Sequence, residues 1–268
     1  MLSTENIEYG VGNKKILNGI SAQFEAGKIN VILGPNGSGK SSFLKIFSGE
    51  IHHFIGAICY GDENIKSLSV EKLARFRAVM SQQTELSFPL TVEEVVMMGR
   101  YPHFAFSPTA KDLDICRQAM EKMSLVAFTE RNYLTLSGGE KQRVQFARVL
   151  AQSLESGQSL RYLFLDEPLN SLDVNYQQEF LQAAKEFADH NTVVIAILHD
   201  VNLAIQYADE LFFIREGKLT AKGSPAEIIT GSLLEEVFRV NTTIIQNPVT
   251  GKPLVIFDTG NTDKKWSF

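Results

Sequence analysis

The sequence predicts an α/β protein built on a parallel sheet, and two observations support this fold class. Three short apolar runs, rich in β-branched and aromatic residues, end abruptly in Gly, Asp or His, which is typical of buried parallel strands. Helical patterns lie between these runs, as expected when helices cover a parallel sheet. The predicted strands are Ile29–Leu33, Tyr162–Leu165 and Val193–Leu198, and the predicted helices include Ser42–Ser48, Val144–Leu154 and Gln177–Ala188.

Composition excludes several other classes. The chain has 268 residues, of which 44% are hydrophobic and 21% charged, with a formal net charge of −5. These values argue against disorder and against general electrostatic binding of nucleic acid. The apolar runs are strand-sized, shorter than the roughly 18–20 residues that a membrane helix needs. The N-terminus lacks a signal-peptide pattern, and two distant cysteines, Cys59 and Cys116, fit a reducing compartment and are expected to be packing residues.

The middle of the chain has a different pattern. From about Thr84 to Asn132, a turn at Phe88-Pro89 precedes one helical pattern from Val92 to Gly99 and another at Leu113–Met123. Because nothing in this stretch resembles a strand, it is expected to be a helical insertion. A surface loop is expected at Ser153–Leu160, and the polar end of the chain from about Gly260 is expected to be frayed.

A phosphate-binding loop follows the first predicted strand and precedes a predicted helix. Its residues are Gly34-Pro35-Asn36-Gly37-Ser38-Gly39-Lys40-Ser41, a full P-loop pattern in the context that this motif requires. Glycines allow backbone amides to face phosphate oxygens, and the helix start adds positive potential. Lys40 can reach the β- and γ-phosphates, and the Ser41 hydroxyl can ligate Mg²⁺.

Two carboxylates end the second predicted strand. Asp166 follows the apolar run and is well placed to hold Mg²⁺ through water, while Glu167 can polarise a water that attacks the γ-phosphate. Because neighbouring residues on a strand point in different directions, the two side chains are expected to have different roles.

A second candidate anion site begins at Ser137. Ser137 and Glu140 form a capping box, and Gly138 and Gly139 between them suggest close approach of another group to the helix start. One nucleotide does not need two such helix starts in one chain. We therefore expect this segment to serve a nucleotide held mainly by a second subunit.

Together, the P-loop, the LSGGE segment, the Asp-Glu strand end, Ser171-Leu172-Asp173 and His199 resemble the ATP-binding cassette (ABC) ATPases over roughly residues 2–230. The resemblance implies a P-loop NTPase fold with a RecA-like core and an N-terminal antiparallel β-subdomain. Residues 1–258 would form a single ATP-binding domain, with a helical subdomain inserted at about 84–150. A C-terminal tail would follow at 259–268.

The resemblance also implies a head-to-tail homodimer in which each ATP lies between the P-loop of one subunit and the LSGGE segment of the other. Ser137, Gly138 and Gly139 would then contact the nucleotide in trans, Asp173 would bridge the subunits, and His199 would sense the γ-phosphate. Glu167, His199 and Gln82 would act in catalysis.

Three further positions follow from the same resemblance. Tyr9 occupies the position of the aromatic residue that stacks on adenine, although ordinary strand packing is an alternative. Gln82, or the adjacent Gln83, corresponds to a glutamine that contacts Mg²⁺ and the attacking water. Ser42 completes the nucleotide-binding set, but stands where Thr is usual.

Finer sequence features resemble importer ATPases for iron chelates, haem and cobalamin; they are Lys72–Met80, Phe88–Val92 and Met98–Arg100. Within that group, Arg77–Met80 and Ala147–Gln152 are most similar to haem importers, whereas Tyr101–His103 is also common among ferric-siderophore importers. The expected partners are two copies of a membrane permease and, indirectly, a periplasmic haem-binding protein. Membrane contact at the cytoplasmic face of the bacterial inner membrane would occur only through the permease.

Two alternatives belong to other functional classes. A soluble ABC ATPase of DNA repair or translation usually has long coiled-coil insertions or two cassettes, and this chain shows neither pattern. A small-molecule kinase would leave LSGGE and His199 unexplained. His52, His53 and His103 are interpreted as ordinary surface or packing residues rather than haem ligands, because an importer ATPase need not touch its cargo.

Overall fold

The computed structural model describes residues 1–81, 86–154, 160–170, 172–189 and 191–258, and its centre is a six-stranded sheet. All neighbouring strands pair in parallel except the first two. Three of the strands confirm the predicted apolar runs to within a residue or two at each end. In spatial order they are β10 (Lys218–Gly223), β9 (Glu210–Arg215), β3 (Ile29–Leu33), β8 (Thr192–Ile197), β7 (Arg161–Asp166) and β6 (Arg77–Met80).

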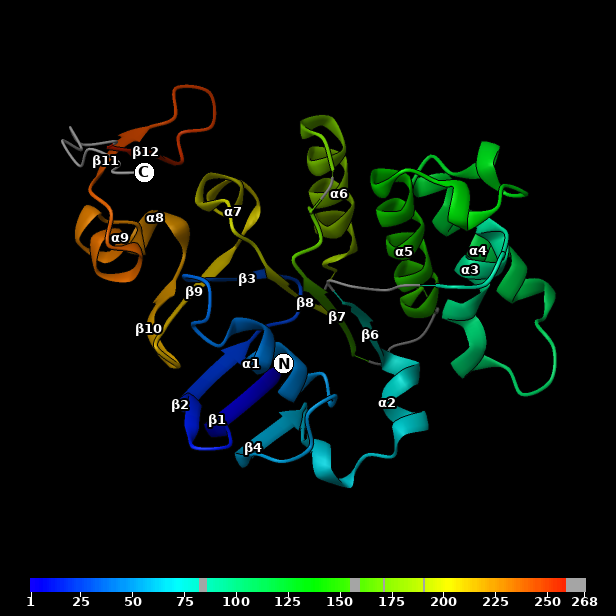
Figure 1. Cartoon of the computed structure of the whole chain (residues 1–268), viewed down its shortest axis with the longest axis horizontal. Helices are drawn as coiled ribbons and strands as arrows, with labels where there is room; N and C mark the ends of the chain where they lie inside the picture. Colours follow the sequence, from blue (N-terminus) through cyan, green and yellow to red (C-terminus); the bar gives the residue numbers. More distant parts are fainter. Residues whose placement is uncertain (82–85, 155–159, 171, 190, 259–268) are drawn as a thin grey trace, which may run out of the picture.

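Helices and a second sheet cover the two faces of the central sheet (Figure 1). On one face lie α6 (Val174–Phe187) and α7 (Val201–Tyr207), and on the other lies α1 (Lys40–Phe47). The predicted helices of the core are confirmed. The helix α5 (Gly138–Ser153) begins well before its apolar pattern, because the capping box at Ser137 starts it.

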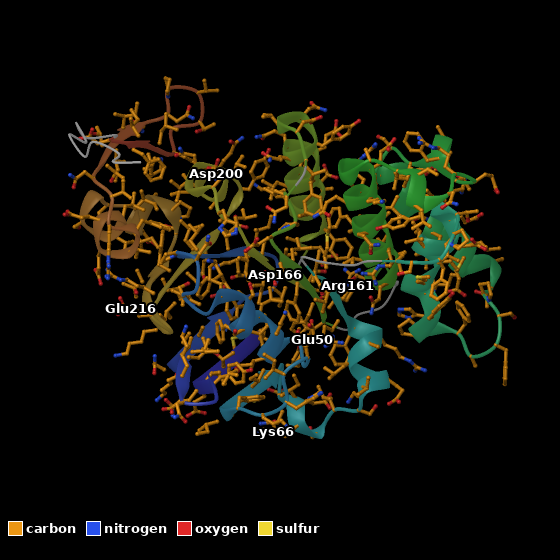
Figure 2. The ribbon with its side chains drawn as sticks, in the orientation of Figure 1. Glu50, Lys66, Arg161, Asp166, Asp200 and Glu216 are labelled. Carbon is orange, nitrogen blue, oxygen red and sulfur yellow. The ribbon has the colours of Figure 1, made fainter. Side chains whose placement is uncertain are left out.

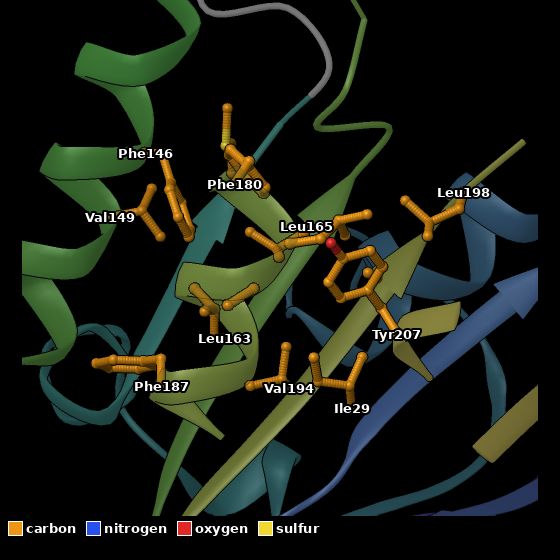
Figure 3. Packing of buried hydrophobic residues seen from close by; sticks show 14 of the residues in the cluster. Ile29, Phe146, Val149, Leu163, Leu165, Phe180, Phe187, Val194, Leu198 and Tyr207 are labelled. Atoms are coloured by element: carbon orange, nitrogen blue, oxygen red, sulfur yellow. The ribbon is translucent and has the colours of Figure 1, made fainter. Parts of the chain in front are cut away.

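The predicted strands are continuously apolar because both of their faces are buried. Along β7, Leu163 and Leu165 belong to one hydrophobic cluster, while Tyr162 and Phe164 belong to a second cluster across the sheet. The first cluster is drawn in Figure 3, where Phe146 of α5 stacks on Phe180 of α6 with ring centroids 3.8 Å apart. Alternate side chains therefore pack in opposite directions, as the strand period requires.

A four-stranded antiparallel sheet lies below the central sheet in Figure 1 and shares the second cluster. The residue patterns alone had not indicated its strands, although the family resemblance implied an antiparallel β-subdomain at this end. In spatial order they are β2 (Lys14–Phe24), β1 (Leu2–Val11), β4 (Ile55–Tyr60) and β5 (Glu63–Asn64), followed along the chain by the short helices η1 (Ile65–Ser67) and α2 (Val70–Phe76).

The predicted helical insertion contains only helices and turns over its described residues 86–132, apart from one isolated bridge between Thr91 and Asn132. A buried ion pair joins its parts: Arg100 Nε lies 3.0 Å from Asp112 Oδ1, and Arg100 also donates to the Ala151 carbonyl of α5. The elements of this stretch are α3 (Val92–Met97), η2 (Met98–His103), α4 (Ala110–Lys122) and η3 (Val126–Phe128), and η4 (Tyr133–Thr135) follows it.

The C-terminal part packs beside α7. Asn202 of α7 exchanges two hydrogen bonds with the Val255 backbone, at 3.0 and 2.8 Å. Its elements are α8 (Pro225–Ile228), α9 (Gly231–Phe238), β11 (Thr242–Gln246) and β12 (Pro253–Phe257). The predicted tail at 259–268 and most of the predicted loop at 153–160 lie outside the described residues.

Candidate functional site

The P-loop connects β3 to α1 at the C-terminal edge of the central sheet. Gly34 has φ +154, and a Cβ there would lie 2.0 Å from the Ile214 carbonyl oxygen, so only glycine fits this turn against β9. Gly39 is the N-cap of α1, which begins at Lys40. The first backbone N–H groups of a helix have no partner within it, and they form an anion-binding end.

Lys40 lies inside this loop. Its side chain is 5% exposed, and its ammonium donates hydrogen bonds to the carbonyls of Gly34 at 2.8 Å and Pro35 at 3.0 Å. Burial lowers the pKa of Lys40, while the nearby carboxylates of Glu167 and Asp166 oppose that shift. The amine is therefore kept close to two carboxylates at the point where the loop meets the helix.

Asp166 and Ser41 are brought together from different elements. The Ser41 hydroxyl donates to Asp166 Oδ1 at 3.1 Å, and Asp166 is 3% exposed at the end of β7. Burial raises the pKa of Asp166; the Ser41 hydrogen bond lowers it, and the charge of Glu167 raises it further. A carboxylate and a hydroxyl are the oxygen ligands that Mg²⁺ accepts, so this pair fits that ion.

Glu167 follows β7 directly, and its carboxylate has different partners from that of Asp166. Alternation along a strand, the expected reason, does not apply, because β7 ends at Asp166 and Glu167 is not extended. Its Oε1 lies 2.6 Å from His199 Nε2, and its Oε2 accepts a hydrogen bond from the Asn170 amide at 3.1 Å. Glu167 has φ 50, an uncommon backbone conformation for a residue other than glycine. Such conformations persist where the surrounding structure fixes them, and they cluster at functional sites. Sequence reasoning missed Asn170, whose only signal was its position three residues after Glu167.

Lys40, Ser41, Glu167 and His199 line a cavity of about 710 Å³, and Asp166 is bonded to Ser41 but is not part of the lining. The cavity is lined by most of the predicted P-loop residues and by two of the three predicted catalytic side chains, Glu167 and His199; the third, Gln82, lies outside the described residues. Its lining includes five positions that the sequence had not indicated, Lys14, Lys15, Ile16, Glu216 and Gly217. The full lining is Lys14, Lys15, Ile16, Asn36, Gly37, Gly39, Lys40, Ser41, Ser42, Glu167, His199, Glu216 and Gly217.

Tyr9 lies beside this cavity rather than in its wall. It lines a neighbouring groove of about 460 Å³ with Gly10 and Phe54, and Lys15 lines both hollows. Tyr9 also packs against the second hydrophobic cluster. Tyr9 therefore packs within its sheet and also faces the groove next to the cavity.

The Ser137 segment lies at the exposed start of α5 and does not line the cavity. Glu140 N–H is bonded to Ser137 Oγ at 3.3 Å, and Glu140 Oε2 accepts from Ser137 N–H at 2.7 Å, which confirms the capping box. The backbone hydrogen bond from Ser137 is the largest of the effects that lower the pKa of Glu140. The amides of Gly138 and Gly139 are thus the first-turn donors that the cap does not use.

Asp173 is the N-cap of α6 and accepts a hydrogen bond from Tyr176 N–H at 3.0 Å. Like the Ser137 segment, it is exposed and outside the cavity. Gln82, Gln83 and Ser171 lie outside the described residues. Within one chain, the P-loop and the acidic strand end therefore lie together. Ser137, Gly138, Gly139 and Asp173 do not join them.

The residues set aside as haem ligands are dispersed. His52 and His53 are exposed, and the His103 ring lies 2.9 Å from the Gln152 carbonyl oxygen. Cys116 is fully buried, and burial raises the pKa of its thiol to about 12. Over the described ranges, no three His, Cys, Asp or Glu side chains are grouped as a metal site, and no helix has the length and hydropathy needed to span a membrane.

Known proteins are similar to this chain in sequence. A family model described as ABC transporter matches residues 17–170, more than half of the chain. Curated relatives named hemin import ATP-binding protein HmuV match nearly all of it. The relative from Agrobacterium fabrum is 39% identical over 259 residues, which are 96% of this chain and 98% of the relative. The relative from Escherichia coli O157:H7 is 36% identical over 96% of this chain and all of its own length.

The fold is shared with solved structures. An inward-facing metal-chelate type ABC transporter superposes with a TM-score of 0.79 at 24% identity, covering 96% of both chains. A nucleotide-free ATP-binding cassette superposes with a TM-score of 0.73 at 21% identity, covering 89% of this chain and 94% of its own. From the family match, the whole-length relatives and the shared fold, the chain belongs to the ABC transporter family and has the fold of its ATP-binding cassettes.

Proposed function

We propose that this chain is the ATP-hydrolysing, energy-coupling subunit of a bacterial importer for hemin. One observation carries the catalytic part: Lys40, Ser41, Asp166, Glu167 and His199 meet at one edge of the central sheet. The cargo part is supported by the curated relatives, which are 36–40% identical and are named for hemin import.

In this proposal, residues 34–42 bind the triphosphate of ATP through backbone amides, the hydroxyls of Ser41 and Ser42, and the Lys40 ammonium. Glu167 accepts a hydrogen bond from the attacking water and orients it towards the γ-phosphate. His199 lies 2.6 Å from Glu167, so it can hold that carboxylate and contact the γ-phosphate. Lys40 neutralises charge that develops on the leaving phosphate oxygens.

Mg²⁺ fits the Ser41–Asp166 pair, with Gln82 as a further ligand from the family resemblance. When bound, the ion neutralises phosphate charge. The hydroxyl-to-carboxylate hydrogen bond keeps both oxygens within one ion's reach, and the burial of Asp166 excludes water from its side of the site. In the proposal, the carboxylate is ionised when it faces the ion and Lys40.

The proposed working unit is a head-to-tail homodimer. Ser137, Gly138 and Gly139 of one subunit contact the nucleotide held by the other subunit, and Asp173 lies at the contact between them. Two facts support this arrangement: the Gly138 and Gly139 amides lie at an exposed helix start, and none of these residues lines the cavity of its own chain.

Residues 1–258 are proposed to form one ATP-binding domain, with a helical subdomain at about 84–150 inserted in the catalytic core and a tail at 259–268. The dimer would bind two copies of a permease at the cytoplasmic face of the inner membrane and would contact the membrane only through them. A periplasmic haem-binding protein would deliver the cargo.

The test is ATP-driven uptake into vesicles that contain the permease, with the chain and a cargo-binding protein added. We expect ATP-dependent accumulation of hemin, stimulated ATP hydrolysis, and loss of both with Glu167→Gln, which should trap ATP in a stable dimer. Uptake of a ferric siderophore or cobalamin instead of hemin would contradict the cargo assignment. Full hydrolysis that never responds to the permease would favour a soluble, non-transport ABC ATPase.

A further inference from the structure

The far wall of the P-loop cavity is the turn Glu216-Gly217, which joins β9 to β10. Both residues have positive φ, 50 and 74. Gly217 N–H donates to the Ser38 carbonyl of the P-loop at 3.0 Å, and Asn18 of β2 donates to the Glu216 and Gly217 carbonyls at 3.0 and 2.8 Å. A Cβ at Gly217 would lie 2.2 Å from the Ile16 carbonyl oxygen. The turn is therefore fixed between β2 and the P-loop.

Sheet order places this turn opposite the catalytic carboxylate. The P-loop follows β3, which lies between β9 on one side and β8 and β7 on the other. Glu167 and His199 follow β7 and β8, whereas Glu216 follows β9, and all three line one cavity. In Figure 2, Asp166 lies near the centre of the molecule and Glu216 lies towards the left edge. When the terminal phosphate faces Glu167, the Glu216 side of the cavity is left for the nucleoside.

The Glu216 carboxylate keeps one oxygen for a neutral donor. Arg215 Nε at 3.4 Å and Arg239 Nη2 at 3.5 Å lie beside it, but the Glu216 side chain is 73% exposed, so water screens both pairs and they are weak. Both arginines approach Oε1. Across the described part of the chain, no ion pair is formed by Oε2 of Glu216, and a carboxylate oxygen only accepts hydrogen bonds.

ATP has two kinds of hydrogen-bond donor at its nucleoside end, the ribose hydroxyls and the adenine amine. The turn is bonded directly to Ser38 of the phosphate-binding loop, and the sugar is the part of the nucleoside attached to the phosphates. The adenine amine lies at the far side of the base, beyond the sugar. The position of the turn therefore favours a hydroxyl.

We propose that Glu216 accepts a hydrogen bond from a ribose hydroxyl of the nucleotide and so is a specificity-determining residue that favours ribonucleotides over deoxyribonucleotides. This inference rests on the proposed function, because it takes ATP as the ligand of the cavity. The role is in binding and not in the chemical step, since Glu216 lies across the P-loop from Glu167.

The experiment measures dissociation constants of ADP, 2′-deoxy-ADP and 3′-deoxy-ADP for the full-length chain by calorimetry with Mg²⁺. The wild-type chain should bind ADP about three- to tenfold more tightly than at least one deoxynucleotide. Glu216→Asn should weaken ADP binding by that factor and leave the affected deoxynucleotide unchanged. Asn-Gly is the preferred sequence for a turn with two positive φ angles, so this variant keeps the turn while shortening and neutralising the side chain.

Arg239→Ala is the matched control, because it removes an ion pair of Glu216 but keeps the carboxylate; sugar discrimination should persist in it. Equal weakening of all three nucleotides by Glu216→Asn, or no discrimination by the wild-type chain, would overturn the inference alone. Discrimination against inosine diphosphate that vanishes in Glu216→Asn would assign the contact to the base and overturn the sugar assignment. Failure of the wild-type chain to bind ADP at all would overturn the proposed function too.

Discussion

Two helix starts in this chain offer backbone amides to an anion, and they differ in almost everything else. The start of α1 is surrounded by a buried lysine, a hydroxyl bonded to a buried carboxylate, and a second carboxylate paired with a histidine. The start of α5 is exposed at Ser137 and Gly138, and it has a capping box, two glycines and an ion pair between Glu140 and Arg131. Phosphate chemistry needs both charge neutralisation and a water-orienting base. The start of α1 therefore has the groups that phosphate chemistry needs, whereas the start of α5 has groups only for contact with an anion.

The largest expected effect tests whether the start of α1, rather than the start of α5, is the main phosphate site. Lys40→Ala should reduce ATP turnover by at least about a hundredfold, because the buried ammonium is the cation nearest the phosphates in the proposed site. Steady-state phosphate release checks this. Lys122→Ala, a change at the exposed end of α4, should keep wild-type turnover. Full activity of Lys40→Ala would show that the start of α1 is not the nucleotide site.

The next effect concerns the buried ion pair through which the helical insertion is bonded to α5. Arg100 is 1% exposed and is bonded to both Asp112 and the Ala151 carbonyl near the end of α5. Asp112→Ala removes a buried counter-ion of that guanidinium and should lower the free energy of unfolding by about 3–5 kcal/mol. Urea denaturation measures this change. A loss below 1 kcal/mol would contradict the structural role of the pair.

The same carboxyl gives a pH dependence. Burial, the largest influence, raises the pKa of Asp112, but hydrogen bonds from Thr109 and the Arg100 ion pair outweigh it and lower the pKa to about 2. Because the folded-state pKa lies below that of the unfolded chain, this contribution is complete above about pH 4. It should be lost between about pH 4 and pH 2, and the loss should be missing from Asp112→Ala.

Mixing two defective chains tests whether the two helix starts serve one nucleotide. Lys40→Ala disables the P-loop, and Ser137→Arg places a bulky side chain at the start of α5. In a head-to-tail dimer containing one chain of each kind, both defects fall in one site and the other site is intact. An equimolar mixture should therefore recover up to about a quarter of the wild-type sites. Turnover no higher than that of either variant alone would place each complete site within one chain.

The sequence predicted some strands of the central sheet and not those of the antiparallel sheet. The strands β3, β7 and β8 were predictable because both of their faces are buried, which gives continuous apolar runs. Leu211–Ile214 of β9 had the same signal and was overlooked. The strands of the antiparallel sheet have mixed burial patterns, such as that of β1, and only the family resemblance implied them.

The candidate site was predictable where it follows a local motif. The P-loop, Asp166 and Glu167 are contiguous with strands and helices that the sequence indicated. Asn170 and Glu216 were not found, because their positions at the site depend on side-chain directions and on the order of strands across the sheet. No spacing along the chain brings Glu216 to residue 38; only the pairing of β9 with β3 does so.

The smallest expected effect concerns Asp166, beside the start of α1, where turnover and stability are expected to change in opposite directions. Burial is the main cause that raises the pKa of Asp166, so the native state binds a proton more tightly than the unfolded chain does. Stability contributed by this group therefore falls as pH rises above the unfolded-state value, and at neutral pH the ionised carboxylate opposes folding. Asp166→Asn should raise the free energy of unfolding by about 1 kcal/mol at pH 7 while abolishing turnover. The gain should shrink as the pH is lowered towards 4, whereas Asp62→Asn, at an exposed turn, should change neither stability nor turnover. A loss of stability in Asp166→Asn would mean that the carboxylate supports the fold as well as the reaction.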